Sequence, residues 1–176
     1  MLYFVECSFA DPGSEAEWND FYSQQKLPAL ISVSGFSTSQ RFRAMHGGCP
    51  EYLAVHTIDS VAVLQGEEYR HKGGGNFSRW QPYITDWRRN IYTGIAVASG
   101  VRNNEFLLFS ESGPEPLLNA GVSPEGLQAI ALDQFPMQRW VAVVSEGVAD
   151  IQNLLSQGVF CYQPITDQLT PLGVSA

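Results

Sequence analysis

The sequence is poor in charged residues and in cysteine. Only 16% of its 176 residues are charged, whereas 44% are hydrophobic. This composition excludes an intrinsically disordered chain, which needs high charge and few apolar side chains. The three cysteines show no CxxC spacing, which argues against a disulfide scaffold and a zinc site. No apolar run approaches the roughly 20 residues of a membrane span, so we expect no membrane partner.

Positive charge is scarce as well. Lys and Arg number 10 against 18 Asp and Glu, giving a net charge of −8. Because such a surface repels phosphate backbones, nucleic acid is not an expected partner. Eight of the ten cations precede residue 102, so either an anionic ligand binds the first half or the asymmetry is chance. The first five residues suggest a strand and not a signal peptide, which predicts a cytoplasmic protein.

The first half of the chain alternates between strand and helix patterns. Apolar and β-branched runs predict strands over 2–9, 37–45, 52–59 and 91–98. Helical spacing predicts a helix from Ser14 that ends or kinks near Pro28, and a short helix over 60–69. Residues 80–89 fit neither pattern clearly. The resulting order, βαββαβ, is the ferredoxin-like plan.

The second half repeats this order in a less regular form. Strands are predicted over 106–110, 127–135, 139–145 and 159–165, and helices over 114–120 and 148–157. The predicted fold class is therefore α+β, with two tandem ferredoxin-like units packed sheet to sheet as an α/β barrel. The units are expected to span 1–98 and 99–176. An alternative is a barrel completed by a second chain in a homodimer.

The first half resembles a known family. The residues that carry the resemblance are Trp18 and Tyr22, the segment Lys26-Leu27-Pro28-Ala29-Leu30, Gly35-Phe36, Arg41-Phe42, Tyr52-Leu53-Ala54-Val55 and Ile58-Asp59-Ser60. Together they are similar to the EthD-like branch of the dimeric α/β-barrel superfamily. The similarity covers about residues 1 to 69 and continues more loosely to 98.

The resemblance implies a small-molecule function without fixing a reaction. It suggests a cofactor-independent isomerase, lyase or monooxygenase that acts on a compact, aromatic or lactone-like molecule in the barrel cavity. The alternative is a non-catalytic ligand-binding or interaction protein of the same fold. One position departs from the family, which often has His before the Leu-Pro pair, where this chain has Lys26. No cofactor and no metal site are expected.

Glu6 and His56 are the predicted catalytic pair. Alternation along the first strand places Glu6 on the barrel face, and alternation along the third places His56 and Tyr52 there too. Facing residues of neighbouring strands lie about 5 Å apart, so the two side chains could form a carboxylate–imidazole base. The alternative is that both are structural residues of the core.

Further predicted substrate-binding residues lie on a glycine-rich loop and in an aromatic cluster. The loop over 70–78 contains three consecutive glycines and suggests either a lid or a plain surface loop. Aromatic rings and nearby arginines could bind a planar or anionic ligand, or could simply be packing residues. The predicted substrate-binding set is Tyr52, Arg41, His71, Arg79, Trp80 and Trp87.

Overall fold

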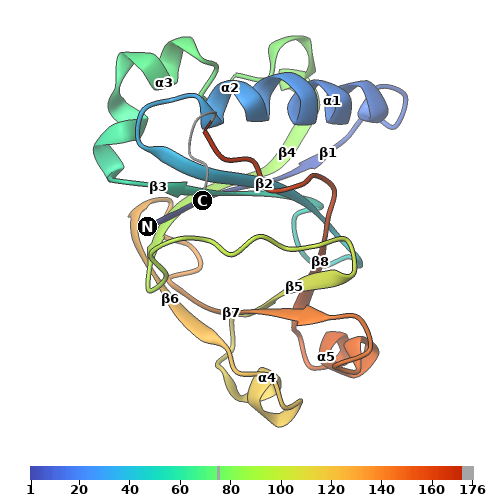
Figure 1. The fold of residues 1–176 in the computed structure, drawn as a ribbon. Coiled ribbons are helices and arrows are strands. Elements are labelled where there is room, and N and C mark those ends of the chain that lie inside the picture. The colour runs from blue at the N-terminus through green and yellow to red at the C-terminus, as the bar shows by residue number, and fades with distance from the viewer. Residues whose placement is uncertain (75, 172–176) are drawn as a thin grey trace.

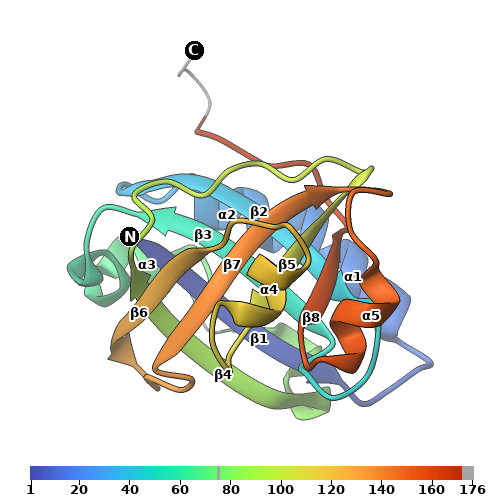
Figure 2. The same ribbon diagram turned by 90° about the horizontal axis from the view of Figure 1, so that it is seen from below.

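The computed structural model describes residues 1–74 and 76–171, which form one α+β fold. Eight antiparallel strands close into a barrel in the order β1-β3-β2-β8-β5-β7-β6-β4. Figure 1 shows α1, α2 and α3 covering one side of this barrel and α4 and α5 lying against the other. Seen from below in Figure 2, the strands cross the molecule diagonally around a common interior. No helix in the described ranges is long and apolar enough to cross a membrane.

The first half provides four neighbouring strands. They are β1 (Leu2–Phe9), β2 (Phe36–Ala44), β3 (Tyr52–Ile58) and β4 (Ile84–Thr93), in the order β4-β1-β3-β2. Between β1 and β2 run α1 (Glu15–Phe21), a π-helical turn (Tyr22–Lys26) and α2 (Leu27–Ile31). Between β3 and β4 lie a 3-10 turn (Val61–Gln65), α3 (Glu67–His71) and a second 3-10 turn (Ser78–Tyr83).

The second half provides the other four strands. They are β5 (Glu105–Ser110), β6 (Glu125–Leu132), β7 (Gln138–Ser145) and β8 (Phe160–Pro164), in the order β8-β5-β7-β6. The connecting helices are short: α4 spans Glu115–Asn119 and α5 spans Ile151–Ser156. The strand order within this half therefore repeats that of the first half, with each strand at the equivalent place.

The two halves are joined by hydrogen bonds along both edges. β2 pairs with β8 through Phe42 and Pro164, and β4 pairs with β6 through Asn90 and Leu132. Closure leaves no free edge strand among the eight, which removes a common route to aggregation. The two units were expected to pack sheet to sheet as a barrel. The structure joins the strands of both halves into one continuous barrel within a single chain.

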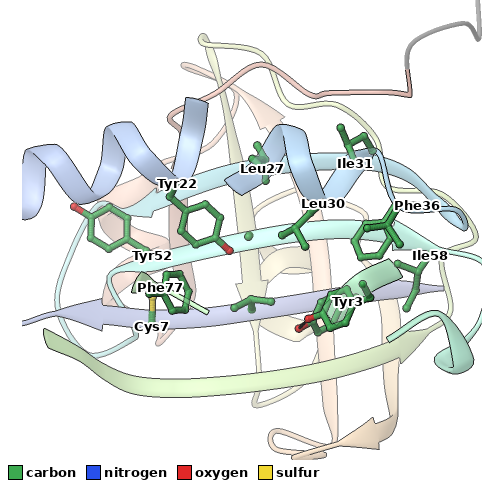
Figure 3. Close-up of a cluster of buried hydrophobic side chains, with 14 of the residues drawn as sticks. Tyr3, Cys7, Tyr22, Leu27, Leu30, Ile31, Phe36, Tyr52, Ile58 and Phe77 are labelled. Atoms are coloured by element: carbon green, nitrogen blue, oxygen red, sulfur yellow. Dashed lines mark hydrogen bonds between the residues drawn. The ribbon is translucent and has the colours of Figure 1, made fainter. Parts of the chain in front are cut away.

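The barrel wall separates an interior apolar core from two outer ones. The interior is filled with side chains such as Phe4, Phe42 and Phe109. One outer core packs the second-half strands against α4 and α5. The second outer core lies between the first-half sheet and its helices and includes Tyr3, Trp18 and Tyr22. Figure 3 shows this second core, where Tyr22, Leu27 and Leu30 point from the helices toward the sheet.

The fourth strand departs from the sequence-based expectation. It was predicted over 91–98 but spans Ile84–Thr93, because pairing with β1 extends it backward through residues without a clear pattern. It ends at Gly94, which has a φ of +118° and lies against the backbone of Gly126, where a Cβ would meet a carbonyl oxygen at 2.0 Å. Only glycine fits this position, and the turn that it allows takes the chain out of the sheet.

Candidate functional site

A π-helical turn places two reactive side chains in the helix–sheet layer. Tyr22 and Lys26 begin and end this turn, which joins α1 to α2 without breaking the helix. The helix was expected to end or kink near Pro28, and it widens into this π turn just before Pro28 and ends soon after it, at Ile31. Both Tyr22 and Lys26 are buried. Such π turns inside α-helices occur frequently at functional sites.

Lys26 is a buried lysine that bonds to backbone carbonyls. Its side chain is nearly inaccessible, with the residue 5% exposed. The ammonium donates to the carbonyl of Gly73 and, at 2.6 Å, to that of Asn76, and it lies 4.6 Å from the ring centre of Phe77. Burial lowers the pKa of Lys26 from 10.5 to about 8. A larger share of this amine is therefore neutral and able to accept a proton near neutral pH than in an exposed lysine.

Three buried polar atoms in the same layer have no hydrogen-bond partner among the described residues. They are Trp18 Nε1, Tyr22 Oη and His56 Nε2. Each of these residues is at most 2% exposed. Because an unpaired buried polar group costs roughly 1–3 kcal/mol, such atoms suggest a bound molecule that would satisfy them.

The helix–sheet layer is positively charged. Its buried cations are Lys26 and Arg41, while Glu6 is the one buried carboxylate among the described residues and lies on the other side of the barrel wall. Arg41 donates to the backbone oxygen and side chain of Asn19 and to Ser23, and burial lowers its pKa to about 10. This layer would therefore stabilise a ligand that becomes negative.

Lys26 separates an outer groove from an inner gap. The groove has a volume of about 240 Å³ and is lined by Phe21, Gln25, Lys26 and the loop residues near Gly73. The gap is only about 10 Å³ and lies between Lys26, Tyr3, Tyr69 and Trp87. A ligand that enters from the groove would therefore have to displace the loop that Lys26 holds.

His56 does not pair with Glu6, and the predicted dyad is wrong. The two residues lie on opposite faces of the sheet: His56 stacks on Tyr3 at 5.5 Å between ring centres, in the helix–sheet layer. His56 Nδ1 bonds to Ser39 Oγ at 2.7 Å, whereas Glu6 accepts from Arg139 at 2.8 Å. The alternation along β3 misled the prediction because all seven residues of this strand are buried, so neither face stands out as polar.

The remaining predicted residues are divided between two environments. Arg41 and Tyr52 lie in the helix–sheet layer, where the Tyr52 hydroxyl bonds to Asn19 and Glu15. Trp87 packs edge-on against Phe77 at 5.3 Å and lines the inner gap, although it is 39% exposed. Trp80 is buried and packs on Phe21 at 4.9 Å.

Two predicted residues lie on the surface instead. His71 is exposed at the end of α3, and Arg79 forms an exposed ion pair with Glu17 at 2.5 Å. Within the predicted lid, Gly75 lies outside the described residues, and Gly73 and Asn76 on either side of it are the carbonyl partners of Lys26. The structure thus connects this loop to Lys26, whereas the side chains of His71 and Arg79 lie on the surface and do not take part in that contact.

Within the part of the barrel that the structure describes, a cavity lies toward each end of β1. The larger, about 370 Å³, is mainly apolar and lies beside Leu2 and the segment 94–99. The smaller, about 210 Å³, lies beside Glu6 and Arg139. Arg139 was missed because a lone arginine in a strand carries no sequence signal. Among the described residues no group of three or more potential ligands is arranged to hold a metal ion.

The burial of His56 predicts an acid-dependent stability. Burial, aided by the nearby Lys26 charge, lowers the pKa of His56 from 6.5 to about 3. The native state then binds fewer protons than the unfolded chain between these values, so stability falls as the pH drops below 6.5. Between pH 7 and pH 4 this effect should cost wild type about 3 kcal/mol of stability, and we expect His56→Gln to abolish that loss, measured by urea unfolding at the two pH values. His71→Gln, which removes an exposed imidazole, is the control; equal pH dependence in both variants would contradict the prediction.

Comparison with solved structures identifies proteins with a similar fold. An anthrone oxidase-like protein matches with a TM-score of 0.54 and 11% identity, covering 99% of this chain and 95% of that one. A candidate monooxygenase from Fusobacterium nucleatum has a TM-score of 0.54 and 8% identity, with 99% of this chain and 97% of that one covered. A candidate monooxygenase from Lactobacillus acidophilus has a TM-score of 0.51 and 9% identity, with 96% of this chain and 95% of that one covered. The sequence matches no protein-family model and no curated protein.

Proposed function

We propose that this chain is a cofactor-independent enzyme that oxidises an electron-rich aromatic compound with O₂ in the helix–sheet layer. The observation that carries the proposal is Lys26, a buried amine with a pKa of about 8 and, among the described residues, no carboxylate partner. The similar fold of an anthrone oxidase-like protein supports the choice of substrate class. Lys26 is the proposed general base.

The chemistry requires only a base and O₂. A methylene group activated between aromatic rings loses a proton to the neutral Lys26 amine, leaving an electron-rich anion. This anion reduces O₂, and for oxidation of CH₂ to C=O the balance is substrate plus O₂ giving ketone plus water. No external reductant enters, so Lys26 and a dry, positively charged layer suffice.

The surroundings of Lys26 would favour the anion over the neutral substrate. The Lys26 ammonium formed on proton transfer and the Arg41 guanidinium 4.1 Å from the Tyr22 ring centre supply positive charge in a buried layer. The unpartnered Tyr22 hydroxyl and His56 Nε2 would bind the oxygens of a hydroxylated ring. Aromatic side chains such as Phe77 and Trp87 would pack against its faces.

Non-catalytic binding is the alternative function, and one experiment separates the two. Purified, chelator-treated protein is mixed with a hydroxyanthrone while O₂ uptake and anthraquinone formation are followed, against the rate in buffer. The anthraquinone itself serves as a ligand that can bind but not react. We expect O₂ uptake in a 1:1 ratio to product. Binding of both compounds without acceleration would support a binding protein, and absence of binding would overturn both functions.

The fold relationship is proposed on the same basis. We infer that each half is a ferredoxin-like unit, that the two units arose by duplication, and that the chain belongs with the dimeric α/β-barrel proteins. The repeated strand orders, β4-β1-β3-β2 and β8-β5-β7-β6, support this. Because one chain supplies both halves, a homodimer is not needed to close the barrel. A chain truncated after the first half would then need a second copy to cover its exposed sheet face.

The loop that Lys26 holds is predicted to open when Gly74 is substituted. A Cβ on Gly74 would lie 2.2 Å from the Tyr69 ring, and Tyr69 in turn bonds to Tyr3 at 3.0 Å. Either the ring or the loop must move in Gly74→Ala. We expect tryptic cleavage at Lys72, which directly precedes this loop, to accelerate at least fivefold. Gly47→Ala, with nothing within 4 Å of the new Cβ, should cleave at the wild-type rate; equal rates in the two variants would refute a closed loop.

A further inference from the structure

The smaller barrel cavity contains a buried ion pair with unused hydrogen-bonding capacity. Arg139 donates through Nη2 to Glu6 Oε1 at 2.8 Å and to Glu111 Oε1 at 3.0 Å. Glu6 and Arg139 are only 2% and 3% exposed. Glu6 Oε2 and Arg139 Nη1 nevertheless have no partner among the described residues. One acceptor and one donor are thus left over on the same buried pair.

The cavity has space and a suitable lining for a ligand beside this pair. Its volume of about 210 Å³ exceeds the roughly 150 Å³ of an engineered cavity that binds benzene. Phe109, Phe160 and Tyr162 line it with aromatic rings. Cys49 also lines it and is half-buried, whereas Cys7 and Cys161 are buried.

The charges of the cavity lining balance. Glu6 and Glu111 contribute two negative charges, and Arg88 and Arg139 contribute two positive charges. An ionic ligand would add a charge without a counterion in a buried place, which is costly. A neutral ligand with a donor for Glu6 and an acceptor for Arg139 would satisfy both free atoms without this cost.

We propose that this cavity is a second ligand site, distinct from the helix–sheet layer, that binds a small neutral aromatic carboxamide or lactam. The N–H of the ligand donates to Glu6 Oε2, and its carbonyl accepts from Arg139 Nη1. The ring packs among Phe109, Phe160 and Tyr162. The site does not depend on the oxidation proposed above, because the two layers lie on opposite sides of the barrel wall.

Four probes of similar size test the proposal. Benzamide carries the neutral donor–acceptor edge, benzoate is its anionic counterpart, benzamidine its cationic counterpart, and toluene lacks the edge. Binding to the full chain is measured by ligand-observed NMR and by protection of Cys49 from iodoacetamide, mapped by mass spectrometry. Cys7 and Cys161 are internal controls for general unfolding.

We expect benzamide to bind at least tenfold more tightly than the other three and to protect Cys49. Glu6→Gln, which replaces the free acceptor by an N–H₂ donor of the same shape, should weaken benzamide at least tenfold. Phe160→Trp, which reduces the space without touching the ion pair, should also abolish protection. Equal binding of all probes, tighter binding of benzamidine or benzoate, or no binding because the cavity holds water only, would each overturn the proposal.

Discussion

Replacement of Lys26 by methionine is expected to lower the rate of aromatic oxidation by at least a hundredfold, with the fold retained. General-base catalysis contributes about 10²–10⁴ to a rate, and Lys26 is the proposed base. Methionine has a similar length and no charge. It can pack against the aromatic rings that surround Lys26, such as that of Phe77. Oxygen uptake under saturating substrate measures kcat, and circular dichroism checks the fold.

Lys26→Arg separates proton transfer from positive charge. Arginine can keep hydrogen bonds to the Gly73 and Asn76 carbonyls but does not give up its proton at neutral pH. We therefore expect this variant to be as inactive as Lys26→Met while the loop stays closed to trypsin. Arg102→Met, which removes an exposed cation in the second half, is the control for net charge. Retention of more than a tenth of the wild-type kcat in Lys26→Arg would exclude Lys26 as the base.

The pH dependence gives a second measure of the same group. With a pKa of about 8, Lys26 becomes neutral as the pH rises through this value, so kcat should increase and then level off above it. The folded pKa lies below the unfolded value of 10.5, so the unfolded chain binds more protons between pH 8 and 10.5. The free energy of unfolding of wild type, relative to that of Lys26→Met, should therefore rise between pH 8 and 10.5.

Replacement of Arg139 by methionine is expected to lower the free energy of unfolding by about 3–5 kcal/mol. Removal of Arg139 leaves the buried Glu6 carboxylate without its counterion. This costs far more stability than replacing both partners by apolar residues. The double variant Glu6→Leu with Arg139→Met should recover most of this loss, because no buried charge then remains unpaired. Urea unfolding with a common m-value measures all three proteins.

The exposed pair of Arg43 and Glu51 provides a matched control. Its two charges are 2.6 Å apart, but the side chains are 51% and 34% exposed. Solvent screening reduces such a pair to at most about 1 kcal/mol, so Arg43→Met should cost little. If Arg139→Met cost no more than Arg43→Met, the buried pair would matter no more than the exposed one and the prediction would be contradicted.

Some features of the site were predictable from the sequence. Along β1, aromatic and apolar residues alternate with Glu6 and Ser8, so the strand's two faces were assigned correctly: Tyr3 lies in the helix layer and Glu6 in the barrel. Lys26 stood out as a departure from the pattern of the family that the first half resembles. Its burial, however, depends on a loop some fifty residues away. The partner of Glu6 lies 133 residues away and was not predictable.

The sequence by itself determined the α+β class, most strands and their order, because hydrophobic period and turn residues act locally. Only the tertiary structure decided which face of β3 meets which layer, since every residue of that strand is buried and local alternation carries no signal there. It also decided that Glu6 pairs with Arg139 and that Lys26 holds the glycine-rich loop. These contacts depend on how distant segments close around one barrel, and the burial that results lowers the pKa of Lys26.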